Sequence, residues 1–287
     1  MHKINAIVVT YYPDDSVLKK NMLALSSQVD HVFIIDNTPK GHCFNSDVDL
    51  SNISIFKLNE NLGIAAAQNV GLKMCLASSI DYCILFDQDS TISPGLINKL
   101  YNAITSKEAI DNSVVAVGPR IIDAYTNKWV KPKFQREKKS GSNLMLTQQI
   151  IASGKLLRTN ALHTIGLMEE SLFIDGVDHE WCWRAIGNGC NIAICNDALM
   201  VHRLGDGVKS FLGMKYHVGS PKRLYYQYRN YFILSQKKYT PFYWKLRHLF
   251  SYSVKIFLFF VFGPDRRLRM KYISNGIKSG LRYKSTE

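Results

Sequence analysis

Residues Tyr82–Asp89 read Tyr-Cys-Ile-Leu-Phe-Asp-Gln-Asp, an apolar run that ends in two aspartates two positions apart. A short apolar run of this kind predicts a strand buried in a sheet. Side chains at positions i and i+2 of an extended chain point to the same side, so we expect Asp87 and Asp89 to share one face where the strand ends. Two carboxylates on one face suit a hard divalent cation that carries phosphate oxygens.

The first 105 residues alternate strand-like and helix-like segments. Strands are predicted at 6–10, 32–35, 53–58 and 82–86, and helices at 16–27, 64–78 and 94–105. This alternation is typical of a parallel sheet flanked by helices. Ligands bind such sheets beyond the carboxyl ends of the strands, where Thr10, Asp36 and Asp87 stand. We therefore expect these three strand ends to meet at one site.

The second part of the chain supplies further candidate side chains. A strand is predicted at 114–118, and the polar, basic stretch 128–142 is expected to form a mobile loop near the rim of the site. Residues 173–181 read Phe-Ile-Asp-Gly-Val-Asp-His-Glu-Trp and offer a possible base. An apolar run ends at His202, a possible further metal ligand.

The net positive charge of the chain lies in residues 221–287. The chain has 287 residues, 46% of them apolar, which excludes general disorder and suits one large α/β domain or a catalytic domain with an appendage. The formal charge is +13, and residues 221–287 hold fifteen Lys or Arg against Asp265 and Glu287. The apolar stretches within residues 221–287 are too short to cross a bilayer, because a transmembrane helix needs about 20 apolar residues. Basic, aromatic helices can instead lie on an anionic membrane surface.

The cysteines and the first residues bear on the compartment. Six cysteines are scattered without a CxxC pair, so we expect reduced and mostly buried thiols. The first residues contain no secretory leader pattern, because the apolar stretch at 6–10 is short and is followed by Tyr-Tyr-Pro-Asp. We therefore expect a cytoplasmic protein, peripheral at the inner face of the cell membrane.

Seven segments carry a resemblance to a known family. They are 8–13 (VVTYYP), 35–37 (IDN), 59–72 (NENLGIAAAQNVGL), 86–90 (FDQDS), 152–154 (ASG), 173–181 (FIDGVDHEW) and 202–205 (HRLG). Their order and spacing resemble family-2 inverting glycosyltransferases, in particular the rhamnosyltransferase-like branch that builds bacterial surface polysaccharides. The resemblance covers nearly the whole chain.

The resemblance implies a GT-A fold, the α/β fold of nucleotide-diphospho-sugar transferases. Its Rossmann-like, mostly parallel sheet is flanked by helices. We expect the catalytic domain at 1–220, with a nucleotide-sugar half at about 1–118 and an acceptor half at about 119–220. A basic, aromatic, helical extension would follow at 221–287.

The resemblance also implies a metal site for Mg2+ or Mn2+. Asp87 and Asp89 match the DxD motif of the family, and Asp89 is the expected direct ligand. His202 matches a histidine that completes the metal shell in some relatives, and Asp206 is a candidate contact to the diphosphate through the metal. The alternatives are a solvated acidic turn and a structural histidine at a strand end.

Asp178 matches the position of the catalytic base in the family. An inverting transfer is a single displacement, so a carboxylate must take the proton of the acceptor hydroxyl. Asp178 could instead be a helix N-cap, and Asp175 is the rival base. The sugar and acceptor pocket is expected to include Gly154, Asp175, Glu180 and Trp181, with Arg158 and Arg184 nearby.

The donor site is expected from the matching motifs. Its residues are Thr10, Tyr12, Asp36, Asn61, Gly63, Asn69, Asp87 and Gln88. Asp36 would accept the imide proton of thymine or uracil, and the alternative is a turn-forming Asp-Asn pair. Many relatives carry Arg at the position of Gln68, which leaves the diphosphate contact there in question.

The leading hypothesis is transfer of L-rhamnose from dTDP-L-rhamnose to a lipid-linked oligosaccharide in surface polysaccharide (lipopolysaccharide O-antigen) synthesis. UDP-galactofuranose or another hexose donor is the alternative. A glycoside hydrolase that pairs Asp178 with Asp87 or Asp175, or a basic nucleic-acid-binding protein, is a more remote one. No nucleic acid is expected as a partner, because no recognised binding motif is present. A dehydrogenase is disfavoured, because no GxGxxG turn follows the first strand.

Overall fold

The computed structural model describes residues 3–43, 51–123, 129, 137–202, 208–211, 214–217 and 220–284. The chain forms two compact units, which are described separately. One falls within residues 1–173 and 177–203, and the other within 174–176 and 204–287. The short segment 174–176 thus groups with the C-terminal part of the chain, although the residues on both sides of it belong to the first unit. The predicted domain boundary at residue 220 stays a prediction.

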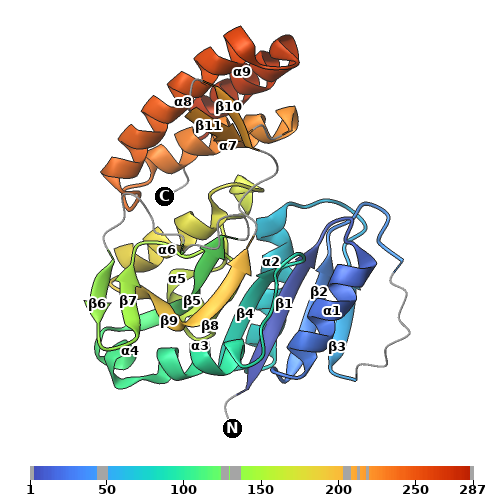
Figure 1. Cartoon of the computed structure of the whole chain (residues 1–287), viewed down its shortest axis with the longest axis vertical. Coiled ribbons are helices and arrows are strands. Elements are labelled where there is room, and N and C mark those ends of the chain that lie inside the picture. The colour runs from blue at the N-terminus through green and yellow to red at the C-terminus, as the bar shows by residue number, and fades with distance from the viewer. Residues whose placement is uncertain are drawn as a thin grey trace. The chain divides into compact units, whose positions relative to one another are not determined.

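The first unit is built on a nine-stranded sheet (Figure 1). Its strands, in spatial order, are β3 (Ile53–Lys57), β2 (His31–Asp36), β1 (Ile4–Thr10), β4 (Tyr82–Asp87), β8 (Lys155–Arg158), β5 (Val114–Asp123), β9 (Asn191–His202), β7 (Leu144–Thr147) and β6 (Lys138–Ser140). β3, β2, β1 and β4 are parallel, as are β5 and β9. β8 is antiparallel to both β4 and β5, and β7 and β6 form an antiparallel edge.

Helices cover both faces of this sheet. They are α1 (Asp15–Ser26), α2 (Ile64–Ala77), α3 (Leu96–Thr105), α4 (Lys107–Asp111), α5 (Ala161–Ile165), the 3-10 helix η1 (Glu170–Leu172) and α6 (Val177–Gly187). The side chains of α1 and α3 join one core cluster with Ala6 and Val8 of β1. α2 covers the opposite face, where Gly71 lies so close to Ile7 that a Cβ would meet its Cγ2 at 2.5 Å. The predicted α/β class with helix-flanked strands is confirmed.

The strand register brings the predicted site residues to one edge of the sheet. Thr10 at the end of β1 pairs with Asp36 at the end of β2, and Val9 pairs with Asp87 at the end of β4. The three strand ends therefore meet as predicted. β8 runs in the opposite direction, and Lys155 stands opposite Leu85, so β8 begins near this edge.

Part of the expected mobile loop at 128–142 is instead ordered in the sheet. Lys138–Ser140 forms strand β6 and pairs with β7, so this part of the expectation is wrong. The polar composition suits an edge strand, because edge strands carry charged side chains that discourage pairing with other chains. Residues 124–128 and 130–136 lie outside the described part of the chain.

The second unit contains three helices and a hairpin among its described residues. The helices are α7 (Pro221–Gln236), α8 (Phe242–Phe262) and α9 (Arg266–Arg282), and the hairpin pairs β10 (Val208–Phe211) with β11 (Met214–His217). Its core cluster includes Leu224, Phe259 and Ile273. Gly276 and Gly280 let α9 approach α7, since a Cβ at Gly280 would stand 2.7 Å from the carbonyl oxygen of Arg229. None of the described helices is both long and apolar enough for a membrane crossing.

Candidate active site

The acidic pair at the end of β4 has one fixed and one exposed carboxylate. Ser153 Oγ donates a hydrogen bond to Asp87 Oδ2 at 2.6 Å, and the Asp87 amide donates to Ser153 Oγ at 3.1 Å. Ser153 Oγ also lies 2.7 Å from Ser90 Oγ. Asp89, in contrast, is exposed to solvent. The fold thus orients Asp87, while Asp89 keeps the accessibility that a direct ligand needs.

Gln88 ties the acidic turn to the loop after β1. Its Oε1 accepts from the Tyr11 amide at 2.7 Å, and its Nε2 donates to the Tyr11 carbonyl at 3.2 Å. Asn21 Nδ2 in α1 donates to the Gln88 carbonyl at 3.0 Å. These contacts give Gln88 a structural role, and a direct contact with the donor stays a prediction.

Two exposed tyrosines follow β1. Tyr11 and Tyr12 are 45% and 61% exposed, and their rings meet edge to face with centroids 4.7 Å apart. Tyr12 has a φ of 45°, and its amide donates to Thr38 Oγ1 at 3.0 Å. An aromatic face that is held by the backbone yet open to solvent suits stacking of a nucleobase.

Asp36 is fully buried and organises the loop after β2. Its carboxylate accepts hydrogen bonds from the amides of Thr38 at 3.1 Å and His42 at 2.5 Å. Thr10 Oγ1 lies 3.4 Å from Asp36 Oδ1. The carboxylate therefore fixes the backbone at two strand ends, and recognition of a base by Asp36 stays a prediction.

The turn before α2 is held by a network of asparagines. Asn37 Nδ2 donates to Asn61 Oδ1 at 3.1 Å, and the Gly63 amide donates to the same oxygen at 3.0 Å. Gly63 has a φ of +86°, and a Cβ there would stand 2.6 Å from the carbonyl oxygen of Phe173. The Ile64 amide donates to that carbonyl at 2.7 Å. This turn is thus braced against the start of the 173–181 segment, and only glycine fits at residue 63.

Asn69 links α2 to the segment around Met168 and Glu170. Its Nδ2 donates to the Met168 carbonyl at 2.9 Å and to Glu170 Oε1 at 2.8 Å, and its Oδ1 accepts from the Met168 amide at 2.8 Å. Asn69 is only 2% exposed. Its amide thus serves the fold, and a contact with the donor stays a prediction.

Asp178 lies in the first turn of α6 beside a buried lysine. Its side chain is 30% exposed, and its Oδ1 lies 3.8 Å from Lys155 Nζ, whereas the side chain of Lys155 is fully buried. Lys155 Nζ also donates to the Asp178 carbonyl at 3.4 Å. Asp178 is the second residue of α6 and therefore not its N-cap. The sequence analysis missed Lys155, because it opens a four-residue strand with a charge at each end and so stands in no clear apolar pattern.

Three consecutive residues connect the acidic pair with Asp178. Ser153 binds Asp87, and Lys155 contacts Asp178. Gly154 between them has a φ of +79°, and a Cβ there would stand 2.7 Å from Pro119 Cγ. The Gly154 amide donates to the Leu85 carbonyl at 2.8 Å, which fixes this turn to the end of β4. One turn therefore brings the acidic pair and the candidate base to the same edge of the sheet.

Glu180 and Trp181 anchor α6 inside the first unit. Both are fully buried. Arg184 makes two hydrogen bonds to the Glu180 carboxylate, at 2.7 and 2.9 Å, and also donates to the carbonyls of Ile165 and Leu167. Trp181 Nε1 donates to the Gly166 carbonyl at 3.0 Å. These bonds hold the helix that carries Asp178, and contact of Glu180 or Trp181 with the acceptor stays a prediction.

Asp175, the rival base, is bound within the second unit. Arg223 Nε lies 3.1 Å from both carboxylate oxygens of Asp175, and Nη2 lies 2.8 Å from Oδ1. Asn230 Nδ2 donates to the carbonyls of Ile174 and Asp175 at 2.6 and 2.9 Å. Asp175 also has a φ of +63°. Both carboxylate oxygens of Asp175 are therefore engaged by a guanidinium, whereas the side chain of Asp178 is 30% exposed.

The structure does not describe the side chains of the two other proposed metal-site residues, His202 and Asp206. His202 ends β9 opposite Asp123, but its side chain, like the whole of Asp206, lies outside the described part of the structure. Within that part, no group of three or more His, Cys, Asp or Glu residues could hold a metal.

Arg158 is not near the site, because antiparallel β8 carries it to the other end of β4, opposite Tyr82. There it donates to the carbonyls of Val114 and Ile104 at 3.0 and 2.6 Å.

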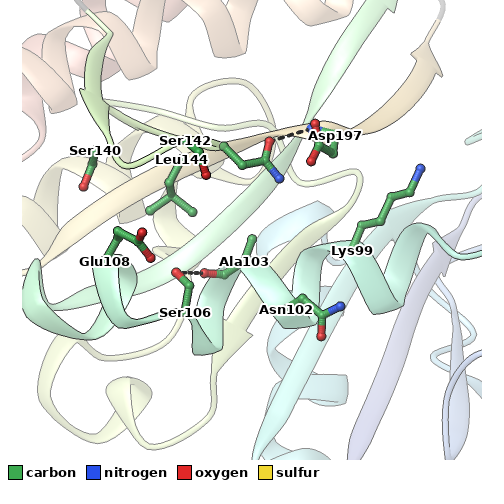
Figure 2. Close-up of a pocket in the computed structure, with 10 residues that line it drawn as sticks. Lys99, Asn102, Ala103, Ser106, Glu108, Ser140, Ser142, Leu144 and Asp197 are labelled. Atoms are coloured by element: carbon green, nitrogen blue, oxygen red, sulfur yellow. Dashed lines mark hydrogen bonds between the residues drawn. The ribbon is translucent and has the colours of Figure 1, made fainter.

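A small pocket lies against α3 and α4, and it contains none of the predicted site residues. Its volume is about 210 Å³, and its lining includes Lys99, Glu108 and Asp197 (Figure 2). Sites for small molecules usually measure about 300–1,000 Å³. We therefore do not connect this pocket with the chemistry.

Comparisons with known proteins agree with this geometry. The glycosyl transferase family 2 model matches residues 6–166. The chain is 32% identical over 246 residues to dTDP-rhamnosyl transferase RfbF of Shigella flexneri, covering 83% of this chain and 81% of the relative. It is 26% identical over 253 residues to galactofuranosyltransferase GlfT1 of Mycobacterium tuberculosis, covering 80% and 82%. The chain belongs to glycosyl transferase family 2.

The fold comparison supports the same conclusion. A crystal structure of GalNAc-T7 with UDP, GalNAc and Mn2+ superposes with a TM-score of 0.56 at 12% identity, over 86% of this chain and 54% of that chain. This chain thus spans about half the length of that structure. The fold is GT-A, and the protein is a glycosyltransferase, as predicted. The donor and the acceptor are not fixed by these matches.

Proposed function

We propose that this glycosyltransferase transfers a sugar from a nucleoside diphosphate to an acceptor hydroxyl by a single inverting displacement, with Asp178 as the base. One observation carries the proposal: the turn Ser153-Gly154-Lys155 contacts Asp87 at one end and Asp178 at the other. A group that binds the diphosphate and a group that accepts a proton are therefore supported by the same turn. This is the arrangement that a displacement between two substrates requires.

The acidic pair suits a divalent cation at the diphosphate. Carboxylate oxygens are the ligands that Mg2+ and Mn2+ prefer, and the exposure of Asp89 leaves it accessible to a metal. Asp87 and Asp89 would hold the cation, with His202 as the third proposed ligand. A bound cation neutralises the charge that develops on the departing diphosphate.

Asp178 accepts the proton of the acceptor hydroxyl. The acceptor oxygen forms a bond to the anomeric carbon as the bond from that carbon to the diphosphate oxygen breaks. Asp178 takes the hydroxyl proton during the attack, which makes the oxygen a better nucleophile. The 30% exposure of the Asp178 side chain leaves the carboxylate accessible to an acceptor that arrives from solvent.

The proposed donor is dTDP-L-rhamnose, and the proposed acceptor is a lipid-linked glycan of surface polysaccharide (O-antigen) synthesis. Support comes from the similarity to the Shigella rhamnosyl transferase, which is greater than the similarity to the mycobacterial galactofuranosyltransferase. UDP-galactofuranose is therefore the second candidate. Tyr11 and Tyr12 offer an aromatic surface for the base of either nucleotide.

A panel of nucleotide sugars tests the donor assignment. With Mn2+ or Mg2+ present, dTDP-L-rhamnose is expected to give the largest thermal stabilisation and the fastest nucleotide release. A donor at about 100 times its dissociation constant stabilises a protein by about 2.7 kcal/mol, which shifts Tm by several degrees. UDP-galactofuranose is the comparison donor. Turnover of UDP-galactofuranose alone would replace the donor, and glycoside cleavage without a nucleotide sugar would overturn the transferase mechanism.

Helix α8 supports a membrane-surface role for the C-terminal part. An exposed stripe runs along it at helical spacing through Phe242, Leu246, Leu249, Phe250, Phe257 and Phe260. Trp244 and Phe259, elsewhere on the same helix, are buried. Helices α7, α8 and α9 together carry twelve Lys or Arg and no Asp or Glu. Exposed aromatic groups among cations suit the headgroup region of an anionic membrane. We assign this role to the inner face of the cell membrane, where the lipid-linked acceptor would be met.

Replacing two residues of the stripe tests this role. Phe250→Ser with Phe257→Ser is expected to weaken binding to phosphatidylglycerol vesicles roughly 30-fold, because burial of the two rings contributes at least about 2 kcal/mol. Vesicle sedimentation measures the effect. Ile110→Ser is the control, since Ile110 is 60% exposed and lies in α4 of the other unit. Undiminished vesicle binding by the double variant, or tight binding to oligonucleotides but not to vesicles, would contradict the membrane role.

A further inference from the structure

Lys155 is a buried cation whose contacts converge on the first turn of α6. Its side chain has no exposed surface. Its Nζ lies 3.8 Å from Asp178 Oδ1, 3.4 Å from the Asp178 carbonyl oxygen and 5.8 Å from the centre of the Trp181 ring. A buried ammonium group is costly unless opposite charge and polar atoms compensate for the lost water. In the described part of the chain, Asp178 supplies this compensation.

The ion pair is close enough to act on Asp178 but too long to occupy its oxygen. A strong hydrogen bond between an ammonium and a carboxylate measures about 2.7–2.9 Å. At 3.8 Å the positive charge still attracts the carboxylate electrostatically. The carboxylate oxygens therefore keep lone pairs for the proton of an acceptor hydroxyl.

Lys155 supplies the charge that acts on Asp178, because the titratable groups beside this pair are neutral or already paired. Glu180 is buried, and its carboxylate is matched by Arg184. Burial raises the pKa of the Cys182 thiol, so this neighbour stays neutral at physiological pH. Both residues lie on α6, and Leu85, opposite Lys155 on β4, is apolar.

The position of Lys155 also fixes the base with respect to the acidic pair. Lys155 follows Gly154, whose amide is bound to the Leu85 carbonyl, and Ser153, whose hydroxyl is bound to Asp87. A shift of Asp178 away from this turn would separate it from its buried countercharge. Lys155 therefore resists movement of the base relative to the metal motif.

We infer that Lys155 is a positioning residue for the transfer: its buried ammonium holds Asp178 at the carboxyl edge of β4. This inference rests on the proposed function, because it gives Lys155 its role through the base. The lysine touches neither substrate nor metal in this role. It acts on the chemical step through Asp178 and not on donor binding.

Replacing Lys155 by methionine tests the inference. Lys155→Met keeps an unbranched side chain of similar length and removes the charge. We expect kcat to fall roughly 10- to 100-fold, since a small misplacement of a reacting group can cost about 100-fold in rate. The KM for the nucleotide sugar should stay unchanged. A lysine that only stabilised the fold would lower Tm without this separate loss of kcat at unchanged KM.

Three further variants separate the possible outcomes. Lys107→Met removes an exposed lysine from α4 and is expected to keep the wild-type kcat and KM. The double variant Lys155→Met with Asp178→Asn removes both charges, so its thermal denaturation shows whether the site folds without them. If Asp178→Asn is inactive while Lys155→Met has the wild-type kcat, only the inference on Lys155 is wrong. If Asp178→Asn keeps wild-type turnover, the base assignment and the inference both fail.

Discussion

Asp178→Asn is expected to lower kcat by about 10²–10⁴-fold while leaving donor binding intact. Asparagine has nearly the same shape as aspartate but cannot take the proton of the acceptor hydroxyl, and general base catalysis contributes about this factor. The donor and the cation bind through other residues in the proposed mechanism, so the KM for the nucleotide sugar should not change. Nucleotide release with and without the acceptor measures kcat, and the thermal shift with donor and Mn2+ measures donor binding.

Asp175→Asn is the matched control for this variant. Asp175 lies three residues earlier, and its carboxylate is held by three short contacts to Arg223. Its replacement breaks an ion pair and is expected to act mainly through local stability, with kcat retained. Substantial residual turnover in Asp178→Asn together with an inactive Asp175→Asn would transfer the role of base to Asp175.

Much of the first half of the fold could be predicted from apolar periodicity and turn residues. The strands that end at Thr10, Asp36 and Asp87 carry local patterns, and their parallel order follows from the alternation with helices. β8 was missed because its four residues, Lys-Leu-Leu-Arg, begin and end with charges and its partners lie far away in the sequence. Pairing between distant segments leaves no periodic signal in so short a strand.

The site shows a similar limit. Motif spacing identified which side chains suit metal and proton chemistry, but it could not show how their hydrogen bonds are distributed. Gln88 and Asn69 carry the expected residue types, yet both amides bond to backbone groups of the protein. The sequence left Asp175 and Asp178 as rivals, because their distinction depends on Arg223, about fifty residues away. Contacts of this kind follow from tertiary structure alone.

Asp89→Ala is expected to remove the metal dependence of donor binding without weakening the fold. The Asp89 side chain is exposed, and exposed substitutions usually change stability by less than about 0.5 kcal/mol. A cation at a diphosphate contributes several kcal/mol to the transition state, so kcat/KM should fall by about 10²–10³-fold. Mn2+ should no longer increase the thermal shift that the nucleotide sugar produces.

Asp87→Ala provides the comparison that distinguishes a ligand from a structural carboxylate. Asp87 accepts the 2.6 Å hydrogen bond from Ser153, so its loss disturbs the turn that also carries Lys155. We therefore expect Asp87→Ala to lower both Tm and activity, whereas Asp89→Ala lowers activity alone. Differential scanning fluorimetry without ligands, followed by titration with Mn2+ and donor, separates the two effects. An Asp89→Ala enzyme that keeps Mn2+-stimulated turnover would show that the cation is held by other residues, and the acidic pair would lose its assigned role.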